Sequence, residues 1–384
     1  MKFTKIALAV AVASAAVAAQ AQTANVTLYG YINTSIESNR GTQGANTVGK
    51  TPGGATINRM TANSSRFGFR GSESLGGGMN AFFQLENSFG SDDGSLGGGV
   101  MWGREAWVGL NGGFGEVKVG YGLTPYDDVL GLSHQNIGST GAQNRNNGVS
   151  GGVGFGFNQL FTNYGRGGTA GCATEGNFDA RAANSISYRT PTMGGLTIRS
   201  TYALVEEVSS NGCKLWDTGA VYANGPITAG LTYSMHSKFR GLGGTTVGQH
   251  DQNAIRGYAR YNAGVARVDA AYEVMSWKVS TGTLKAKYWE LGAQVPFGAA
   301  NLGVQYSQRD NGTAFAYSAP VGYVAPANLA AINAGWSNGG GKHLAIVGDY
   351  AMSKRTKAYA YFSNLKNETN GKLNTLAIGL IHNF

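Results

Sequence analysis

The sequence predicts an all-β protein whose chain forms a closed, transmembrane, antiparallel β-barrel of about sixteen strands. From Asn25 to the end of the chain, apolar residues alternate with polar ones at a period of two, in runs of about ten residues. Between these runs, short connections containing Gly or Asn alternate with long ones. Charged residues make up only 13% of the chain, and 61 of its 384 residues are Gly. This composition suits strands that have one apolar face and one face of small polar residues.

Residues 227–237 show the alternation clearly. One parity is apolar and includes Leu231 and Tyr233, and the other is polar and includes Thr232 and Ser234. Because successive side chains of a strand point to opposite faces, one face of this strand is apolar and the other is polar. Strands that face lipid satisfy their backbone hydrogen bonds only in a closed sheet. A barrel of about sixteen strands then leaves an aqueous channel rather than a packed interior.

The strand boundaries follow from the alternation and from the turn residues between runs. The predicted strands are 26–37, 64–73, 79–89, 101–111, 115–122, 181–191, 196–206, 216–224, 227–237, 253–262, 265–277, 285–296, 300–310, 342–351, 356–365 and 373–384. Short turns such as Gly76-Gly77-Gly78 join them on one side, and the long connections are expected to lie outside the cell. An even strand count brings the first and last strands together. A soluble β-sandwich is the alternative, but it needs more Val, Leu and Ile to build a core.

Aromatic residues gather near the ends of several predicted strands, where girdles at the membrane interfaces would place them. They are Tyr29, Tyr31, Trp102, Trp107, Tyr288, Trp289, Tyr359, Tyr361 and Phe384. The ordinary preference of aromatic residues for strands explains the same pattern, so this feature decides little by itself.

Residues 1–21 are predicted to be a signal peptide, which leaves residues 22–384 as the barrel. Lys2 and Lys5 supply its positive start, residues 6–18 its apolar core and residues 19–21 an A-x-A cleavage site. This core is too short for an anchor helix, and no later window holds the roughly 18 apolar residues that a spanning helix needs. In an exported chain, Cys172 and Cys213 are compatible either with a disulfide or with two free thiols.

The connection from Leu123 to Ala180 is expected to carry function. It is rich in Gly, Asn, Ser and Thr, shows no sustained helical or strand period, and contains an apolar cluster around Phe155 and Phe161. A structureless connection of this length in a compact domain is normally functional or disordered. We expect it to fold inward, pack against the inside of the barrel and narrow the channel.

Other classes of function find little support. The five His residues are scattered, and no H-E-x-x-H or G-x-S-x-G motif occurs in a suitable context, so the chain is not expected to be an enzyme. No Cys/His cluster predicts a metal site and no cofactor is expected, although Asp92 and Asp93 could hold Ca²⁺ weakly. Nucleic-acid binding is disfavoured despite the net charge of +9, because the basic residues are dispersed and the chain is exported.

Seven stretches, in order along the chain, resemble the trimeric general porins of Gram-negative outer membranes. They are residues 26–30 (VTLYG), 64–71 with 75–78 (SSRFGFRG and LGGG), 81–86 (AFFQLE), 104–110 (REAWVGL), 181–188 with Pro191 and Gly194-Gly195 (RAANSISY), Tyr350 with 353–356 (SKRT), and 378–384 (IGLIHNF). Each motif is weak alone, but seven in the right order cover essentially the whole mature chain.

The resemblance implies a homotrimer in the bacterial outer membrane that lets small hydrophilic solutes and ions diffuse through water-filled barrels. It also implies contact with outer-membrane lipid and lipopolysaccharide, and insertion by the barrel-assembly machinery, for which the terminal Phe384 would be the signal. The connection from Leu123 to Ala180 then corresponds to loop 3 of the family. The chain departs from the family pattern at Gly120-Tyr121, where the family often has Arg after the glycine, and in the length of loop 3 and its Cys172.

Carried over by position, the resemblance also implies a basic wall across the pore that includes Arg66, Arg104 and Arg181. Side-chain parity independently places Arg66, Arg70, Arg181 and Arg199 on the polar face. Arg104 instead shares the parity of the apolar residues of its strand, which argues for lipid or subunit contact unless a bulge intervenes.

Asp127 and Asp128, at the start of loop 3, are the expected acidic partners of this wall. Guanidinium groups stay charged when they are close together and attract anions to the channel. The sequence therefore predicts an anion-preferring, non-specific diffusion channel, with a substrate-specific channel for small organic anions as the alternative. A disulfide between Cys172 and Cys213 would fix the end of loop 3 to the barrel rim.

Overall fold

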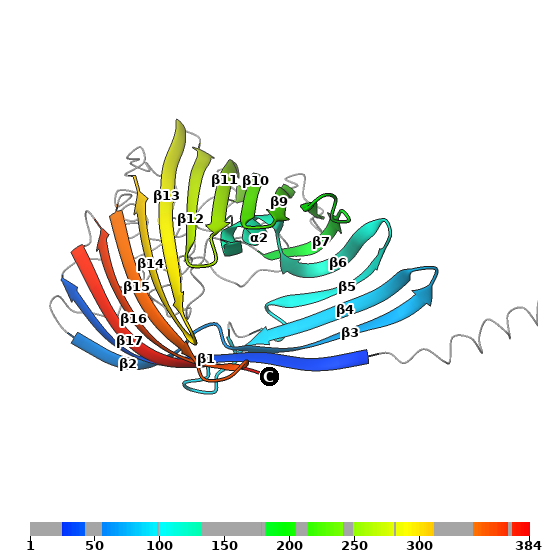
Figure 1. Cartoon of the computed structure of the whole chain (residues 1–384). Coiled ribbons are helices and arrows are strands. Elements are labelled where there is room, and N and C mark those ends of the chain that lie inside the picture. Colours follow the sequence, from blue (N-terminus) through cyan, green and yellow to red (C-terminus); the bar gives the residue numbers. More distant parts are fainter. Residues whose placement is uncertain are drawn as a thin grey trace, which may run out of the picture.

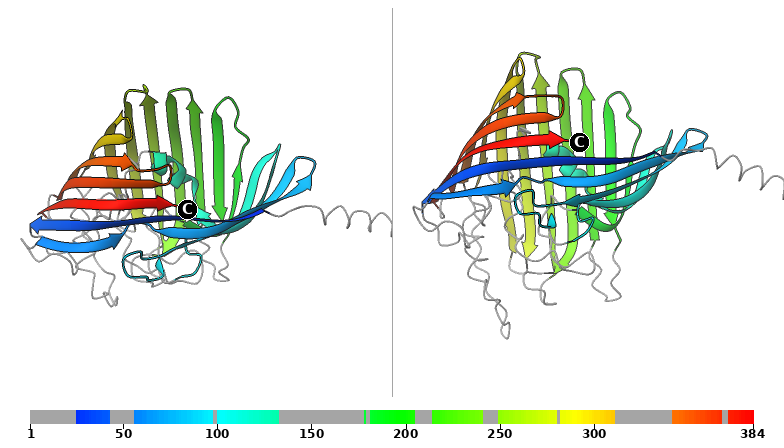
Figure 2. Two further views of the ribbon diagram at one scale, coloured as in Figure 1. Left: turned by 60° about the horizontal axis from the view of Figure 1, so that its bottom comes forward. Right: turned by 90° about the horizontal axis from the view of Figure 1, so that it is seen from below.

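The computed structural model describes residues 25–42, 56–97, 100–132, 178, 181–204, 214–240, 249–279, 282–310, 341–367 and 371–384. Within them, seventeen β-strands form one antiparallel sheet (Figures 1 and 2). The predicted signal peptide, Cys172 and Cys213 lie outside the described residues.

The strand bounds agree with the alternation of the sequence. They are β1 (Asn25–Thr42), β2 (Thr56–Ala62), β3 (Arg66–Gly76), β4 (Met79–Ser88), β5 (Glu105–Gly112), β6 (Gly115–Leu123), β7 (Arg181–Arg189), β8 (Leu196–Ala203), β9 (Lys214–Asn224), β10 (Ile227–Arg240), β11 (Gln249–Asn262), β12 (Arg267–Val279), β13 (Gly282–Phe297), β14 (Ala300–Arg309), β15 (Gly341–Ala351), β16 (Thr356–Asn367) and β17 (Gly371–Asn383). Each overlaps a predicted strand except β2, which the sequence did not separate from the connection before β3.

β2 and β3 together occupy a single strand position of the barrel. Both pair with β1, β2 along its second half and β3 along its first half. They are separated by residues 63–65, where Ser64 has a φ of 59°. The barrel therefore has the predicted sixteen strand positions. The one formed by β2 and β3 is longer than the predicted strand 64–73.

The first and last strands close the barrel, as an even strand count predicts. β1 pairs with β17 from Tyr31 opposite Asn383 to Thr42 opposite Lys372. The last residue, Phe384, exchanges two backbone hydrogen bonds of 3.1 Å with Gly30. A Cβ on Gly30 would lie 2.0 Å from the Phe384 ring, so glycine is needed where the terminal aromatic covers β1. The assembly role expected of Phe384 stays a prediction.

The two faces of the sheet differ as the parity of the sequence predicts. On β10, Leu231 is 55% exposed on the outside of the barrel, whereas Ser234 is fully buried on the inside. Polar and charged side chains on the inner face pack against one another and against the helix α2 (Pro125–Leu132). An apolar outer face and a polar inner face are the arrangement that a barrel in lipid requires.

The aromatic residues near strand ends divide between the two faces. Tyr29 and Tyr288 point inward and donate hydrogen bonds from their hydroxyls to the carboxylates of Glu86 and Glu290. The interpretation of these tyrosines as part of an interfacial girdle is therefore wrong. A buried phenol needs a hydrogen-bond partner, and the inner wall supplies one where lipid does not.

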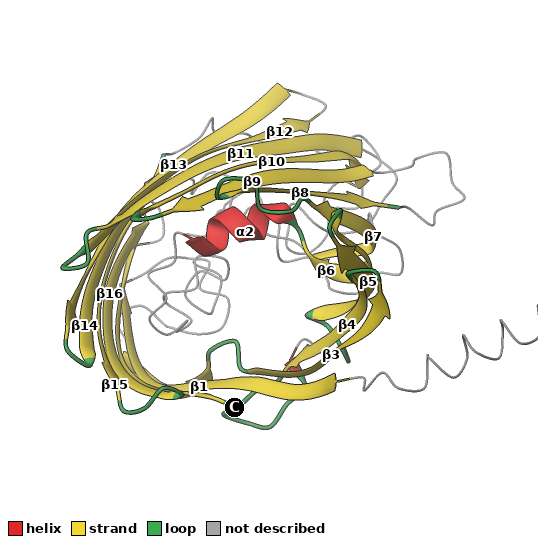
Figure 3. Ribbon diagram, turned by 45° about the vertical axis from the view of Figure 1, so that its right-hand side comes forward, coloured by secondary structure: helices red, strands yellow, loops and turns green. Residues whose placement is uncertain are grey.

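The described part of the chain contains no helix with the length and apolarity that crossing a membrane would require. The helix α2 follows β6 directly and lies inside the ring of strands, beside β8 to β11 (Figure 3).

Candidate pore constriction

The helix α2 is the described beginning of the long connection from Leu123 to Ala180. Pro125 occupies its first position, which the fixed φ of proline favours, and Asp127 and Asp128 lie in its first turn, where the helix dipole stabilises acids. The expectation that this connection has no regular structure is wrong for these residues. A helix of eight residues spans little more than two turns, too short for a recognisable period.

Aromatic residues hold both described parts of this connection against the inner wall. Tyr126, in α2, is fully buried and donates a hydrogen bond from its hydroxyl to Glu273 of β12. Phe178, near the other end of the connection, is fully buried with its ring centroid 5.9 Å from that of Tyr126 and 5.4 Å from that of His236. These contacts place the described residues of the connection inside the barrel. The intervening residues 133–177 lie outside the described part of the chain.

A buried ionic cluster lies under α2 at the point where Tyr126 contacts the wall. Arg256 of β11 is fully buried between Glu273 of β12 at 2.8 Å and Glu290 of β13 at 3.2 Å. The hydroxyl of Tyr288 donates a hydrogen bond of 2.7 Å to Glu290. The wall that receives α2 therefore holds one buried guanidinium between two carboxylates, which leaves the three groups with one negative charge in excess.

Asp128 and Arg199 form the second attachment of α2. Nη1 of Arg199 lies 2.8 Å and 2.9 Å from the two carboxylate oxygens of Asp128, and Nη2 donates to the carbonyl of Leu123. Arg199 lies on the inner face of β8, as its parity predicts, and also donates from Nε to Ser187. One arginine thus binds both the first turn of the helix and the last residue of β6. The expected pairing of Asp128 with a basic side chain is present, as a direct contact rather than across the channel.

Three of the predicted basic residues come together around Glu86 of β4. Nε of Arg104 lies 2.6 Å from one carboxylate oxygen of Glu86, and Nε of Arg66 lies 3.8 Å from the other. Arg181 donates from Nε to the backbone carbonyl of Arg104 at 2.7 Å. Arg66, Arg104, Arg181 and Glu86 are called the arginine cluster below. Two guanidinium groups share the Glu86 carboxylate and the third binds a backbone carbonyl beside them, so the cluster carries an excess of positive charge.

The backbone before β5 explains why the parity of Arg104 wrongly indicated the outer face. The regular strand β5 begins one residue later, at Glu105, and Trp102 just before has a φ of 59°. This irregular turn directs the Arg104 side chain to Glu86 on the inner face, although Val108 of the same parity faces outward. A guanidinium remains charged in such surroundings.

Arg70 and Lys118 add positive charge to the same wall. The Arg70 guanidinium stacks 5.1 Å from the centre of the Tyr29 ring. The Lys118 Nζ lies 4.7 Å from the centre of the Trp107 ring, which is within cation–π distance. Lys118 was missed at the level of sequence, although its parity is opposite to that of the apolar Val117 and Val119.

The inner wall is therefore uneven in charge among the described residues. From β3 to β8 the basic side chains outnumber the acidic ones; they are Arg66, Arg70, Arg104, Lys118, Arg181, Arg189 and Arg199, against Glu86, Glu105 and Glu116. From β9 to β13 the acidic side chains are the more numerous; they are Asp217, Asp269, Glu273 and Glu290, against Arg256, Arg260 and Arg267. No group of three His, Cys, Asp or Glu side chains within the described residues is arranged to hold a metal ion.

A family model described as Gram-negative porin matches residues 7–370. The chain belongs to this family. The porin is 31% identical over 389 residues to outer membrane porin protein 32 of Delftia acidovorans, covering 99% of this chain and 94% of that protein. Its fold resembles a solved structure titled anion-selective porin from Comamonas acidovorans, with a TM-score of 0.69 and 25% identity over 94% of this chain and all of that one.

The resemblance in fold extends to more distant porins. The trimer form of in-vitro folded OmpT of Vibrio cholerae has a TM-score of 0.60 at 13% identity, over 94% of this chain and 99% of that one. Membership of the family and the closed barrel place the porin in the bacterial outer membrane, as a channel rather than an enzyme.

Proposed function

We propose that this porin is a passive diffusion channel for small hydrophilic solutes that prefers anions, and that the arginine cluster and α2 form its constriction. The observation that carries the proposal is the excess of guanidinium charge around Glu86, on the inner face of the barrel. Fixed positive charge along a narrow aqueous path raises the local concentration of anions and lowers that of cations. The relative that is titled an anion-selective porin supports the same sign of selectivity.

Selectivity is expected to depend on Arg66 and Arg181. A unit charge about 5 Å from a passing ion contributes about 0.8 kcal/mol in water before screening. Replacing both residues by Ala is therefore expected to lower the ratio of anion to cation permeability roughly tenfold in dilute KCl, and less in concentrated salt. Reversal potentials of single channels in planar bilayers under a KCl gradient measure this ratio. A cation preference in the unmodified porin, or an unchanged reversal potential in the double variant, would remove the proposal.

Replacing Asp128 by Asn is expected to shift selectivity in the opposite direction. The change removes the carboxylate that neutralises Arg199, while the amide can still accept a hydrogen bond. The permeability ratio should therefore rise in favour of anions, by about threefold in dilute salt. The same bilayer recordings give the result, and a fall in the ratio would mean that Arg199 does not face the ion path.

A channel specific for small organic anions is distinguished by its concentration dependence. Liposome swelling with neutral sugars of increasing size and with organic anions separates the two cases, because a general channel sorts solutes by size and charge only. A single organic anion that enters much faster than its size and charge predict, with saturation, would favour the specific channel.

We infer that the porin assembles as a homotrimer, as the family resemblance implies. The shared fold with a porin solved in trimer form is compatible with this assembly. Native mass spectrometry of the detergent-extracted protein is expected to give a mass three times that of the mature chain.

A further inference from the structure

Two aromatic rings lie next to each other on the inner wall, among side chains that are mostly polar. Phe82 of β4 and Trp107 of β5 have ring centroids 5.1 Å apart, with ring planes at 76°. Both side chains are only partly buried, and Val108, the residue after Trp107, points outward. The pair therefore presents apolar surface to the water of the channel, although the interior of such a barrel is normally polar.

Glycines on the neighbouring strands make room for both rings. A Cβ at Gly109 of β5 would lie 2.7 Å from the Phe82 ring, which is closer than a side-chain carbon can approach. A Cβ at Gly122 of β6 would lie 3.3 Å from the indole of Trp107. Both rings thus pack against the backbone of the wall, and their remaining exposed surface faces the channel.

Two cations flank this pair of rings, one on each side. Nζ of Lys118, on β6, lies 4.7 Å from the centre of the Trp107 ring. Arg70, on β3, lies opposite Gln84 of β4, which lies opposite Trp107. The backbones that carry the two cations are three strand spacings apart, or about 14 Å at about 4.8 Å per spacing, and the rings occupy the two strands between them.

Both cations have charge to offer an anion. Among the described residues, neither Arg70 nor Lys118 forms an ion pair with a carboxylate. Their contacts are with rings, Arg70 with Tyr29 and Lys118 with Trp107, and a cation–π contact uses no hydrogen-bond acceptor. Arg70, Phe82, Trp107 and Lys118 are called the aromatic site below.

The aromatic site lies beside the arginine cluster, on the side of the short turns. Arg70 follows Arg66 by four residues on β3, and β3 ends at the turn that begins with Gly76. Four residues span about 13 Å at a rise of about 3.3 Å per residue. At a strand tilt of about 40°, this is about 10 Å along the barrel axis. An anion that enters from the long connections and passes the arginine cluster meets the aromatic site next.

We propose that the aromatic site binds aromatic carboxylates, which makes them the favoured organic anions of the channel; this inference rests on the anion preference proposed above. The ring of the solute packs against Phe82 in the offset or edge-to-face arrangement that aromatic pairs prefer. Its carboxylate accepts charge-assisted hydrogen bonds from Lys118 or Arg70. A small aliphatic carboxylate makes only the second contact, and a neutral aromatic solute makes only the first.

The test compares how benzoate and acetate block single channels of the full-length porin in KCl, at neutral pH and constant ionic strength. Each anion is titrated, and the concentration that gives half of its maximal reduction in conductance is measured. Benzoate is expected to reach half-block at a concentration about tenfold lower than acetate, because a ring contact adds to the charge contact.

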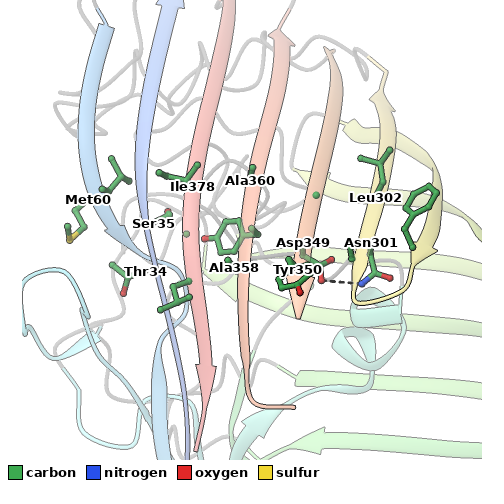
Figure 4. Close-up of a pocket in the computed structure, with 17 residues that line it drawn as sticks. Thr34, Ser35, Met60, Asn301, Leu302, Asp349, Tyr350, Ala358, Ala360 and Ile378 are labelled. Carbon is green, nitrogen blue, oxygen red and sulfur yellow. Dashed lines mark hydrogen bonds between the residues drawn. The ribbon is translucent and has the colours of Figure 1, made fainter. Parts of the chain in front are cut away.

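Conductance is measured rather than total binding because the barrel also has an apolar groove on its outer face (Figure 4). Leu302 of β14 and Ile378 of β17 line this groove, and both side chains are exposed on the outside of the barrel. An aromatic acid bound there lies outside the channel and does not obstruct ions. The block therefore reports occupancy of the channel alone.

Phe82→Leu removes one ring while keeping an apolar side chain. This variant is expected to raise the half-blocking concentration of benzoate about fivefold and to leave that of acetate within about twofold. The matched control is Phe83→Leu, which changes the next residue on β4, whose ring lies over Gly71 on the outer face. The control should be blocked by benzoate as the unmodified porin is.

Three results would overturn the aromatic site. They are equal half-blocking concentrations of benzoate and acetate in the unmodified porin, equal effects of Phe82→Leu and Phe83→Leu, and a block by neutral benzyl alcohol as strong as that by benzoate. Reversal potentials under a KCl gradient are recorded on the same channels. A porin that prefers chloride but does not distinguish benzoate from acetate loses the aromatic site alone, whereas a preference for potassium contradicts the anion preference itself.

Discussion

Replacement of Gly120 by Ala is expected to destabilise the barrel by about 3 kcal/mol or more and to reduce assembly into the membrane. Gly120 lies in β6 opposite Trp107, beside a register shift between β6 and β7, and its φ of 135° is a conformation that side chains rarely adopt. A Cβ at this position would lie 2.3 Å from the carbonyl oxygen of Ala106, which is backbone and cannot move aside without separating β5 from β6.

The matched control for this change is Gly257→Ala in β11. No atom lies within 4 Å of a Cβ at Gly257, so the substitution should change the free energy of unfolding by no more than about 0.5 kcal/mol. Urea unfolding of the detergent-refolded proteins, followed by tryptophan fluorescence, measures both values. The temperature at which the folded band disappears in a denaturing gel gives an independent ranking. If both variants unfold alike, the backbone geometry at Gly120 does not limit stability.

Arg256→Ala is expected to have the second large effect, of about 3 to 5 kcal/mol, because it leaves two carboxylates buried together without a cation. Glu273 and Glu290 both lie against Arg256, and both are almost fully buried. To relieve the repulsion, one of the two carboxylates would have to take up a proton, or water would have to enter the cluster. Either change would occur at the point where Tyr126 attaches α2. We therefore expect both a lower free energy of unfolding and noisier single-channel currents, since α2 loses its support.

Neutralising Arg256, Glu273 and Glu290 together distinguishes a charge effect from a packing effect. The triple variant Arg256→Met, Glu273→Gln and Glu290→Gln removes all three charges at similar side-chain volume, and it should recover most of the lost stability. Chemical unfolding of the single and triple variants in parallel gives the comparison. A triple variant as unstable as Arg256→Ala would show that the cluster matters through its hydrogen-bond geometry rather than through charge balance.

Two arginines of the inner wall make different kinds of contact. Arg199 is committed to α2, because it binds both oxygens of Asp128 and the carbonyl of Leu123. Arg181 binds a backbone carbonyl and leaves its charge unneutralised by that contact. The predicted basic wall is therefore divided into a part that contacts α2 and a part, the arginine cluster, that we propose sets the electrostatic field in the channel.

The sequence determined the barrel because strand periodicity is a local property. Alternation of residues such as Leu231 and Thr232 specifies which side chains meet lipid, and the turn residues specify where each strand ends. These two features predicted the number of strand positions and the antiparallel pairing. They also predicted the inward position of Arg66, Arg70, Arg181 and Arg199. The same parity rule was wrong for Arg104, because an irregular turn at Trp102 precedes its strand and no period records such a turn.

Only the tertiary structure decided which charges meet. Glu86, Glu273 and Glu290 are ordinary polar-face residues in the sequence, and their partners come from other strands and from α2. The helix itself is held by Tyr126 and Asp128, whose contacts are with strands more than 70 residues away. Alternation fixes the face of a residue, but the stagger of the closed barrel fixes its height, and electrostatic contacts depend on both.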